Sequence, residues 1–438
     1  MSKLLRIEHK WLGGDVGSDL ERAFYADIGV SIGNEYLTRL EDTSACTVRN
    51  HLRGSAYQLA AWFAANWWRL RWEPEIPNWS KNPDWRMAHS MASVGGGFVW
   101  PNILFASDGD SLAIASRPSE RTTAIEPVRY LSRMDERILA TEFEQKVDAF
   151  LEGILSRLHS YRICDETLSG VWNEVQAERR DPRMYRRRKL EAICGYDPDE
   201  APDTLLEMLI ANGADLGVAA LEEVAAAGRH STENVLSQIL ELSKSKAPPT
   251  EGGFRGVLPM LTQTPQPTGN QRPWQVAEQF ARFARAQWGL DDAPISDQRL
   301  ADLLKTSPSV FDDRVKMPLS MPLALQKECD GDFDIYFDSK WKVNRRFSVA
   351  RLIGDHLHNS DRLVPATGAK TSRQQFQRAF AQEFLCPFDA LRARIDTEEP
   401  SDDDIQEAAS YFDVSDRVVR TALVNKGELD RETLNAAA

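Results

Sequence analysis

The sequence predicts an α+β protein in which helix predominates. Strand-like segments are concentrated near the start of the chain, at residues 28–32, 35–40 and 103–115, with a later one at 333–337. Apolar residues at spacings of three and four recur from about residue 135 onward, which is the pattern of helices with one buried face. At 438 residues and 49.4 kDa, the chain is long enough for two or three domains.

Changes in composition divide the chain into four regions. Residues 1–130 predict a Trp-rich α+β region, 131–243 a helical region, 244–273 a Pro/Gly-rich linker, and 274–438 a C-terminal domain. The linker prediction depends on the prolines and glycines at 247–253 and 264–269, which favour irregular chain over helix or sheet.

In the first region, Ser55 is positioned to cap a helix that continues past Trp67, and Asp108-Gly109 is a typical hairpin turn. Seven tryptophans in this region could stack nucleic-acid bases or surround a ligand, but core packing is the favoured interpretation because large aromatic side chains bury efficiently. They are Trp62, Trp67, Trp68, Trp72, Trp79, Trp85 and Trp100.

The helical pattern then continues through several segments. Phe143, Val147 and Phe150 begin one apolar face, and further helices are expected at 168–177, 185–194, 203–211 and 216–242. The histidines of the first half are dispersed, with no Asp or Ser at motif spacing, so no catalytic constellation is predicted there. They are His9, His51, His89, His159 and His230.

The formal net charge of −13 argues against long-range attraction of the whole chain to nucleic acid. One dense basic segment at 179–189, which includes Arg186, Arg187 and Arg188, could contact phosphate or an acidic partner. Pairing of this segment with acids such as Glu178 and Glu191 is favoured, because an acidic chain supplies its own counter-charges.

The cysteine pattern and hydropathy exclude other classes of protein. The five cysteines are widely spaced and form no Cys-x-x-Cys pair, which argues against a disulfide framework and a structural zinc site. No apolar run has the length of a membrane span, and the first residues have no apolar signal core. We therefore expect a cytoplasmic protein without membrane contact.

Two helical segments in the C-terminal region carry a recognisable motif. Residues 346–350 read Arg-Phe-Ser-Val-Ala, and residues 380–387 read Phe-Ala-Gln-Glu-Phe-Leu-Cys-Pro. Residues 272–430 thereby resemble the metallopeptidase domain of the ImmA/IrrE family, in which Arg-Phe-x-x-Ala leads into His-Glu-x-x-His and a later helix carries Phe-Ala-x-Glu-Leu-Leu-x-Pro. The resemblance implies a zincin-like fold for this region.

The His-Glu-x-x-His signature itself is missing. In this register Arg351 and Asp355 occupy the two histidine positions, and Leu352 occupies the position of the general base. A guanidinium does not ligate zinc and a Leu side chain takes no proton from water. Arg351 and Asp355 could instead form an ion pair, and the third-ligand region, 374–377, contains no carboxylate. The domain is therefore expected to be a degenerate zincin, without metal or other cofactor.

A rearranged metal site is the alternative. It would be built from Asp355, His356, His358 and Asp361. Asp355 and His358, at i and i+3, could share a helix face, whereas His356 would point elsewhere. The favoured interpretation is that these polar residues end a helix and face water.

Residues 404–427 have the pattern of a helix-turn-helix, with Arg417, Arg420 and Lys426 on its second half. A similar unit closes the peptidase domain of the resembling family, where it packs as part of the fold. Packing is favoured over DNA binding, because the preceding acids at 398–404 would repel phosphate.

The sequence therefore predicts a non-catalytic regulatory or sensing protein that binds a protein partner. By resemblance, this role belongs to stress response, mobile-element control or phage defence. Two alternatives remain open: a metallopeptidase with a rearranged site that cleaves a regulatory protein, and a DNA-binding transcriptional regulator.

Overall fold

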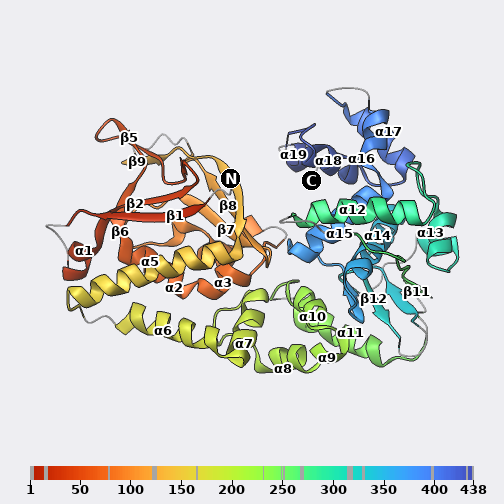
Figure 1. The fold of residues 1–438 in the computed structure, drawn as a ribbon, viewed down its shortest axis with the longest axis horizontal. Coiled ribbons are helices and arrows are strands. Elements are labelled where there is room, and N and C mark those ends of the chain that lie inside the picture. Colours follow the sequence, from red (N-terminus) through yellow and green to blue (C-terminus); the bar gives the residue numbers. More distant parts are fainter. Residues whose placement is uncertain are drawn as a thin grey trace. The chain divides into compact units, whose positions relative to one another are not determined.

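The computed structural model describes residues 4–13, 18–76, 79–120, 126–163, 166–229, 231–247, 249, 252–266, 271–312, 319–327, 331–395, 399–430 and 433–436. The chain divides into two compact units, Met1–Leu206 and Glu207–Ala438 (Figure 1). The fold is α+β with helix predominant, as the sequence predicted. Among these residues, no helix has both the length and the apolar character needed to cross a bilayer.

The strands described in the first unit form three antiparallel sheets. In the largest sheet, β2 pairs with β1, β3 and β6; the second has the order β10-β8-β7 and the third β5-β4-β9. The predicted hairpin at Asp108-Gly109 joins β7 to β8. The bounds are β1 (Leu5–Trp11), β2 (Tyr25–Ile32), β3 (Glu35–Tyr36), β4 (Leu40–Asp42), β5 (Thr47–Arg49), β6 (Leu52–Ser55), β7 (Asn102–Ser107), β8 (Ser111–Arg117), β9 (Val128–Tyr130) and β10 (Met134–Leu139).

Helices α2 and α5 pack against these strands, and α6 and α7 follow (Figure 1). The Ser55 hydroxyl caps α2 by accepting from the backbone N–H of Gln58, as expected. The bounds are α1 (Asp19–Phe24), α2 (Ala56–Ala65), α3 (Trp67–Trp72), α4 (Pro83–His89), α5 (Ala140–Ser160), α6 (Glu166–Arg180), α7 (Pro182–Ile193) and α8 (Asp203–Ala211), with 3-10 turns η1 (Trp79–Lys81) and η2 (Met91–Ser93).

The tryptophans of the first unit are core residues. Five members of the predicted aromatic cluster are buried, and Trp72 is half-buried. The side chain of Trp79 lies outside the described residues. Buried rings cannot stack on bases in solution, so the packing interpretation holds for the five buried ones. These are Trp62, Trp67, Trp68, Trp85 and Trp100.

The second unit combines a four-stranded antiparallel sheet, ordered β11-β13-β12-β14, with helices α9 to α19. Its strands are β11 (Gly253–Gly256), β12 (Leu323–Gln326), β13 (Phe333–Tyr336) and β14 (Leu363–Pro365). Its helices are α9 (Gly213–Leu216), α10 (Val218–Ala225), α11 (Thr232–Lys244), α12 (Pro273–Gln287), α13 (Asp297–Leu303), α14 (Lys342–His358), α15 (Ser372–Leu385), α16 (Phe388–Arg394), α17 (Asp402–Phe412), α18 (Asp416–Asn425) and α19 (Thr433–Ala436), with the 3-10 turn η3 (Pro308–Phe311).

The predicted linker at 244–273 is wrong for its central part. Residues 253–256 form β11, which pairs with β13, and Leu258 is buried in the core of the second unit. Two glycines in this segment allow the backbone to pack closely against its neighbours. A Cβ on Gly253 would lie 2.7 Å from the carbonyl oxygen of Ile335, and a Cβ on Gly256 would lie 2.7 Å from the carbonyl oxygen of Leu304.

The predicted helical region at 131–243 is also divided differently. Its last part belongs to the second unit, because α9, α10 and α11 lie beyond Leu206. The helical segment expected at 216–242 contains α10 and α11, and the Ala-rich run 219–227 is followed by a break at Gly228, as the sequence predicts. Gly217 and Gly228 have φ values of 103° and 96°, a left-handed conformation that interrupts helix before and after α10.

Candidate functional site

The candidate site lies where α14, the helix that carries the degenerate motif, packs against α15. Gly354 marks the closest approach of the two helices: a Cβ at this position would lie 2.5 Å from Cγ and Cδ1 of the fully buried Phe380. No larger residue fits here without movement of the helices. The side chains near this contact therefore occupy a tightly constrained place.

Asp355, at the second histidine position of the motif, is fully buried and held by α15. Arg373 donates to both of its carboxylate oxygens, at 2.8 and 2.5 Å, and also to Asp361 at 2.7 Å. Burial by itself would lower the pKa of Arg373, but the charge and hydrogen bonds of Asp355, the charge of Glu223 and the hydrogen bond to Asp361 raise it above its usual range. A carboxylate engaged by a two-pronged guanidinium is a structural ion pair.

Arg351, at the first histidine position, does not pair with Asp355 as expected. Its Nη2 donates to the carbonyl oxygen of Thr367 at 2.7 Å and to the side-chain oxygen of Gln374. The predicted ion pair is lost because Arg373 reaches Asp355 from the facing helix with better geometry. Burial, together with the neighbouring charge of Arg378, lowers the pKa of Arg351 to about 9, although the charges of Asp338, Asp355 and Glu223 act in the opposite direction.

The remaining motif positions serve packing. Leu352 is fully buried in the apolar core of the second unit. In the third-ligand region, the amides of Gln374 and Gln377 are buried and donate to the carbonyl oxygen of Pro365 at 3.2 and 2.9 Å. These amides connect α15 to the end of β14. They supply no carboxylate toward α14.

Glu223 on α10 completes this polar cluster, and the sequence analysis missed it. Its carboxylate accepts a hydrogen bond from the Thr371 hydroxyl at 2.7 Å, and burial raises its pKa despite that bond. Asp361 packs against the start of the same helix, since a Cβ on Gly217 would lie 2.4 Å from an Asp361 oxygen. Two adjacent Glu residues in an Ala-rich helix give no sequence signal of this contact.

The alternative metal site is not assembled. The rings of His356 and His358 lie against Phe333 and Phe376, with centroid distances of 4.9 and 4.5 Å, while Asp355 faces Arg373. Successive helical residues point in different directions, which separates these side chains. Throughout the described residues, no three His, Cys, Asp or Glu side chains form a group that could hold a metal ion.

The basic segment at 179–189 is largely neutralised within the first unit. Arg188 is buried and pairs with Glu178, Glu191 and Asp199, so its assignment as a partner contact is wrong. Arg187 pairs with Asp203 at 2.6 Å, and Arg186 is half-buried. The buried ion pair of Arg188 with Glu178 holds α6 and α7 together.

The helix-turn-helix-like unit, α17 and α18, packs as part of the second unit. Arg346, the Arg of the lead-in to the motif, is fully buried and donates to the carbonyl oxygen of Asp413 in the turn between these helices. Two of the three candidate contacts are already paired, Arg420 with Asp402 at 2.6 Å and Lys426 with Glu278 at 2.8 Å.

Arg417, the third candidate contact on this unit, differs from the other two. It lies in the first turn of α18 and its side chain is exposed. Burial lowers the pKa of Arg378 on α15, and the charge of Arg417 acts in the same direction.

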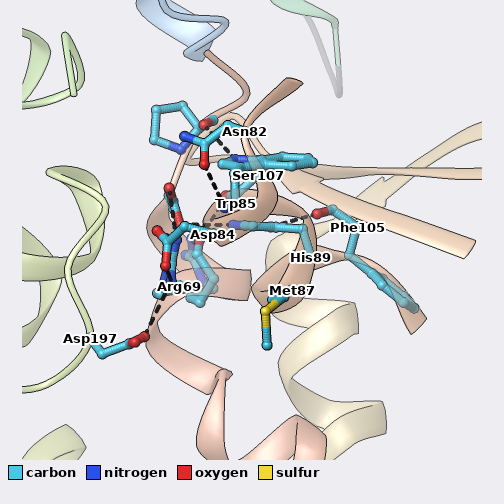
Figure 2. Close-up of polar contacts among 12 residues, drawn as sticks. Arg69, Asn82, Asp84, Trp85, Met87, His89, Phe105, Ser107 and Asp197 are labelled. Atoms are coloured by element: carbon cyan, nitrogen blue, oxygen red, sulfur yellow. Dashed lines mark hydrogen bonds and ion pairs between the residues drawn. The ribbon is translucent and has the colours of Figure 1, made fainter. Parts of the chain in front are cut away.

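The first unit contains a second polar cluster that the dispersed histidines did not predict (Figure 2). His89 is fully buried, with Nδ1 at 2.8 Å from the carbonyl oxygen of Phe105 and Nε2 at 2.9 Å from the carboxylate of Glu73. Both ring nitrogens therefore face acceptor oxygens. The Trp85 ring stacks on His89 at 4.1 Å.

Arg69 is the other cation of this cluster, and it contacts Glu73, Asp84 and Asp197. Burial by itself would raise the pKa of Glu73, but the charges of His89 and Arg69 lower it. Because His89 and Glu73 are buried, the cluster is suited to joining α3, α4 and the turn after α7 rather than to catalysis.

Comparisons of the chain with protein-family models, with curated proteins and with solved structures found no match. The resemblance to the ImmA/IrrE family therefore stays a prediction from the motif residues.

Proposed function

We propose that the second unit is a degenerate, non-catalytic domain of the ImmA/IrrE type, and that the chain is a regulatory or sensing protein that binds a protein partner. One observation carries the proposal. At the two positions where that family places its zinc-binding histidines, Arg351 and Asp355 are both buried and both bonded to α15 or to the turn before it.

These contacts give α14 a structural role rather than a catalytic one. Asp355 joins α14 to Arg373, and Leu352 in the position of the general base is a core residue. A site that retained its chemistry would need a carboxylate or imidazole directed at a reacting water. Arg, Leu and a fully paired Asp do not supply one.

The experiment has two measurements on the full chain. The protein is loaded with excess zinc, desalted and analysed for metal; we expect well under one zinc per chain. His356→Ala and His358→Ala variants serve as controls, because zinc retained by the wild type and lost in either variant would mean that a rearranged metallopeptidase site exists.

The second measurement concerns the partner. Partners captured in the cell of origin are identified, purified and incubated with the chain in the presence of zinc. We expect a stable complex in which the partner stays intact over hours. A partner cut at a defined peptide bond, with the cut abolished by a chelator, would refute the proposal.

A further inference from the structure

Three half-buried side chains meet on the largest sheet of the first unit: Glu8 on β1, Tyr36 on β3 and His51 just before β6. The Tyr36 hydroxyl donates to Oε1 of Glu8 at 2.6 Å, and Nε2 of His51 lies 2.8 Å from the same oxygen. The Tyr36 and His51 rings also pack together, with a centroid distance of 5.1 Å. We call these three residues the histidine cluster. Its members are too far apart in the chain for a sequence motif to reveal them.

The histidine cluster is built over Gly29 in the middle of β2, which is paired with Glu8 on β1. A Cβ on Gly29 would lie 2.7 and 2.9 Å from Cδ2 and Nε2 of the His51 ring, and 3.0 Å from Cγ of Glu8. Any side chain at this position would therefore push the imidazole away from the carboxylate. Glycine inside a strand is typical of a place where another group approaches the backbone closely. The missing side chain of Gly29 thus gives His51 its place beside Glu8.

The carboxylate of Glu8 is held in its ionised form. The hydrogen bond from Tyr36 lowers the pKa of Glu8, although partial burial acts in the opposite direction, and the contacts with His51 and the charge of Arg6 lower it further. An ionised carboxylate only accepts hydrogen bonds, so Nε2 of His51 carries the proton between the two groups. In the singly protonated ring, Nδ1 then keeps its lone pair.

Nδ1 of His51 is free and open to solvent. Within the described residues it forms no hydrogen bond, and it is not among the buried nitrogens that lack a partner. The His51 side chain as a whole is 35% exposed. Because no hydroxyl or thiol of the described chain is bonded to Nδ1, the ring is suited to act as a nucleophile itself. The hydrogen bond to Glu8 stabilises the positive charge that the ring acquires when Nδ1 forms a bond.

The charges around the histidine cluster favour a phosphoryl group as the electrophile. Arg6 and Lys10 lie two positions before and after Glu8 on β1, so all three face the same side of the sheet. Both cations are exposed and form no ion pair within the described chain. Asp27, opposite Lys10 on β2, pairs with Arg53 at 3.2 Å. The cations of this face outnumber its carboxylates, which attracts an anionic phosphoryl donor more than a neutral acyl donor.

We infer that His51 is a phosphorylation site whose Nδ1 accepts a phosphoryl group from an acyl phosphate. The bond between Nδ1 and phosphorus forms while the bond between phosphorus and the acyl oxygen breaks, and the carboxylate leaves with the electron pair. The proton on Nε2 stays in place, facing Glu8. No oxidation or reduction occurs. This site belongs to the first unit and is independent of the function proposed for the second.

The test exposes the full chain to millimolar acetyl phosphate and locates the phosphoryl group by peptide mass spectrometry, with digestion at neutral to alkaline pH because phosphohistidine is labile in acid. We expect phosphorylation of His51, and no label at this position in His51→Asn. His159 is the internal control, since it is exposed and contacts no carboxylate within the described residues. His51 should be labelled at least about tenfold faster than His159.

Glu8→Gln tests the carboxylate as a positioning residue. Gln keeps the size of the side chain but not its charge, so labelling of His51 should slow by about tenfold or more. Glu35→Gln is the matched control, because Glu35 is an exposed carboxylate next to Tyr36 on β3 and contacts neither member of the pair. Its loss should leave the labelling rate unchanged.

NMR of the isotope-labelled protein separates positioning from packing. Long-range proton–nitrogen correlations should show the proton of His51 on Nε2 in the wild type and a mixture of the two tautomers in Glu8→Gln. A purely structural role for Glu8 would not change the tautomer.

The inference is overturned if acetyl phosphate leaves His51 unlabelled, if the label is found only on Asp or Glu, or if His159 is labelled as fast as His51. Equal labelling rates in Glu8→Gln and Glu35→Gln would also exclude it. The substituted side chains are exposed or half-buried, so the variants should fold, and far-UV circular dichroism checks this.

Discussion

Replacement of Gly354 by Ala should destabilise the second unit by forcing α14 away from α15. The new Cβ would lie 2.5 Å from Cγ and Cδ1 of Phe380 and 2.9 Å from its Cβ. Ordinary carbon contacts are about 3.5 to 4.0 Å, so the helices or the ring would have to move by about 1 Å. The ring has little freedom, because Phe380 is fully buried and stacks on Phe384.

The expected loss follows from two opposing effects. Overpacking of a filled core costs about 1–3 kcal/mol, and a clash as close as this one belongs to the upper part of that range, about 2–3 kcal/mol, whereas Ala in place of Gly inside a helix contributes about 1 kcal/mol of stability. We therefore expect a net loss of about 1–2 kcal/mol in the free energy of unfolding for Gly354→Ala.

Hydrogen exchange of the full chain, read by mass spectrometry, measures this loss locally. Amides of α14 and α15 should exchange roughly 5 to 30 times faster in Gly354→Ala than in the wild type. The control is Gly153→Ala in α5, where nothing lies within 4 Å of the new Cβ, and this change should slow exchange slightly.

A second substitution tests whether the contact with Phe380 causes the loss of stability. Because the clash is with Phe380, the double variant Gly354→Ala/Phe380→Leu should lose less stability than the two single losses added together. If Gly354→Ala slows exchange in α14 as Gly153→Ala does in α5, the close approach of α14 and α15 is wrong.

Three further predictions concern charge and burial. Asp355→Asn should lower the free energy of unfolding by about 3 kcal/mol, because it leaves the buried Arg373 with one anion fewer; a loss below about 1 kcal/mol in urea denaturation would contradict this. Burial alone would raise the pKa of Asp297, but Lys342 and Arg346 lower it below its usual value. The ionised Asp297 therefore stabilises the folded protein fully above the unfolded pKa of this group, about 4. This contribution disappears as the pH falls through the lower pKa of the folded state. Urea midpoints between neutral and acidic pH should therefore fall less steeply in Asp297→Asn than in the wild type, and parallel curves would exclude this role. Iodoacetamide at mildly alkaline pH should label the exposed Cys46 but leave Cys386 unmodified, because burial raises the pKa of the Cys386 thiol to about 12. Labelling is measured by peptide mass spectrometry. Prompt labelling of both cysteines would contradict the burial of Cys386.

Local patterns predicted most helices and several strands correctly. The helix beginning after Ser55 has its predicted Ser cap, and the hairpin at Asp108-Gly109 forms as expected. These features depend on residues close in sequence, such as a cap three positions from its N–H or a turn between adjacent strands. The loss of His-Glu-x-x-His residue types is likewise visible in the chain itself.

Strand β11 shows where such reasoning fails. Its four residues, 253–256, contain two glycines and give no strand signal. They form a strand because β13, some eighty positions later, offers a backbone to pair with, and Arg255 pairs with Asp334 across it. A short edge strand of this kind is stabilised by its neighbour and not by its own propensity.

For the candidate site, too, some features follow from the sequence alone and others only from the tertiary structure. The sequence by itself determined which residues stand at the key positions of the resembling motif, Arg351 and Asp355 at its metal-binding positions and Leu352 at its general-base position, because that is a matter of side-chain chemistry at fixed spacing. Only the tertiary structure decided what these residues do instead. Asp355 pairs with Arg373 and not with Arg351, and Glu223 reaches Thr371 from 148 positions away. Buried charges take the partner with the best geometry in three dimensions, and spacing along one helix cannot reveal a partner on another.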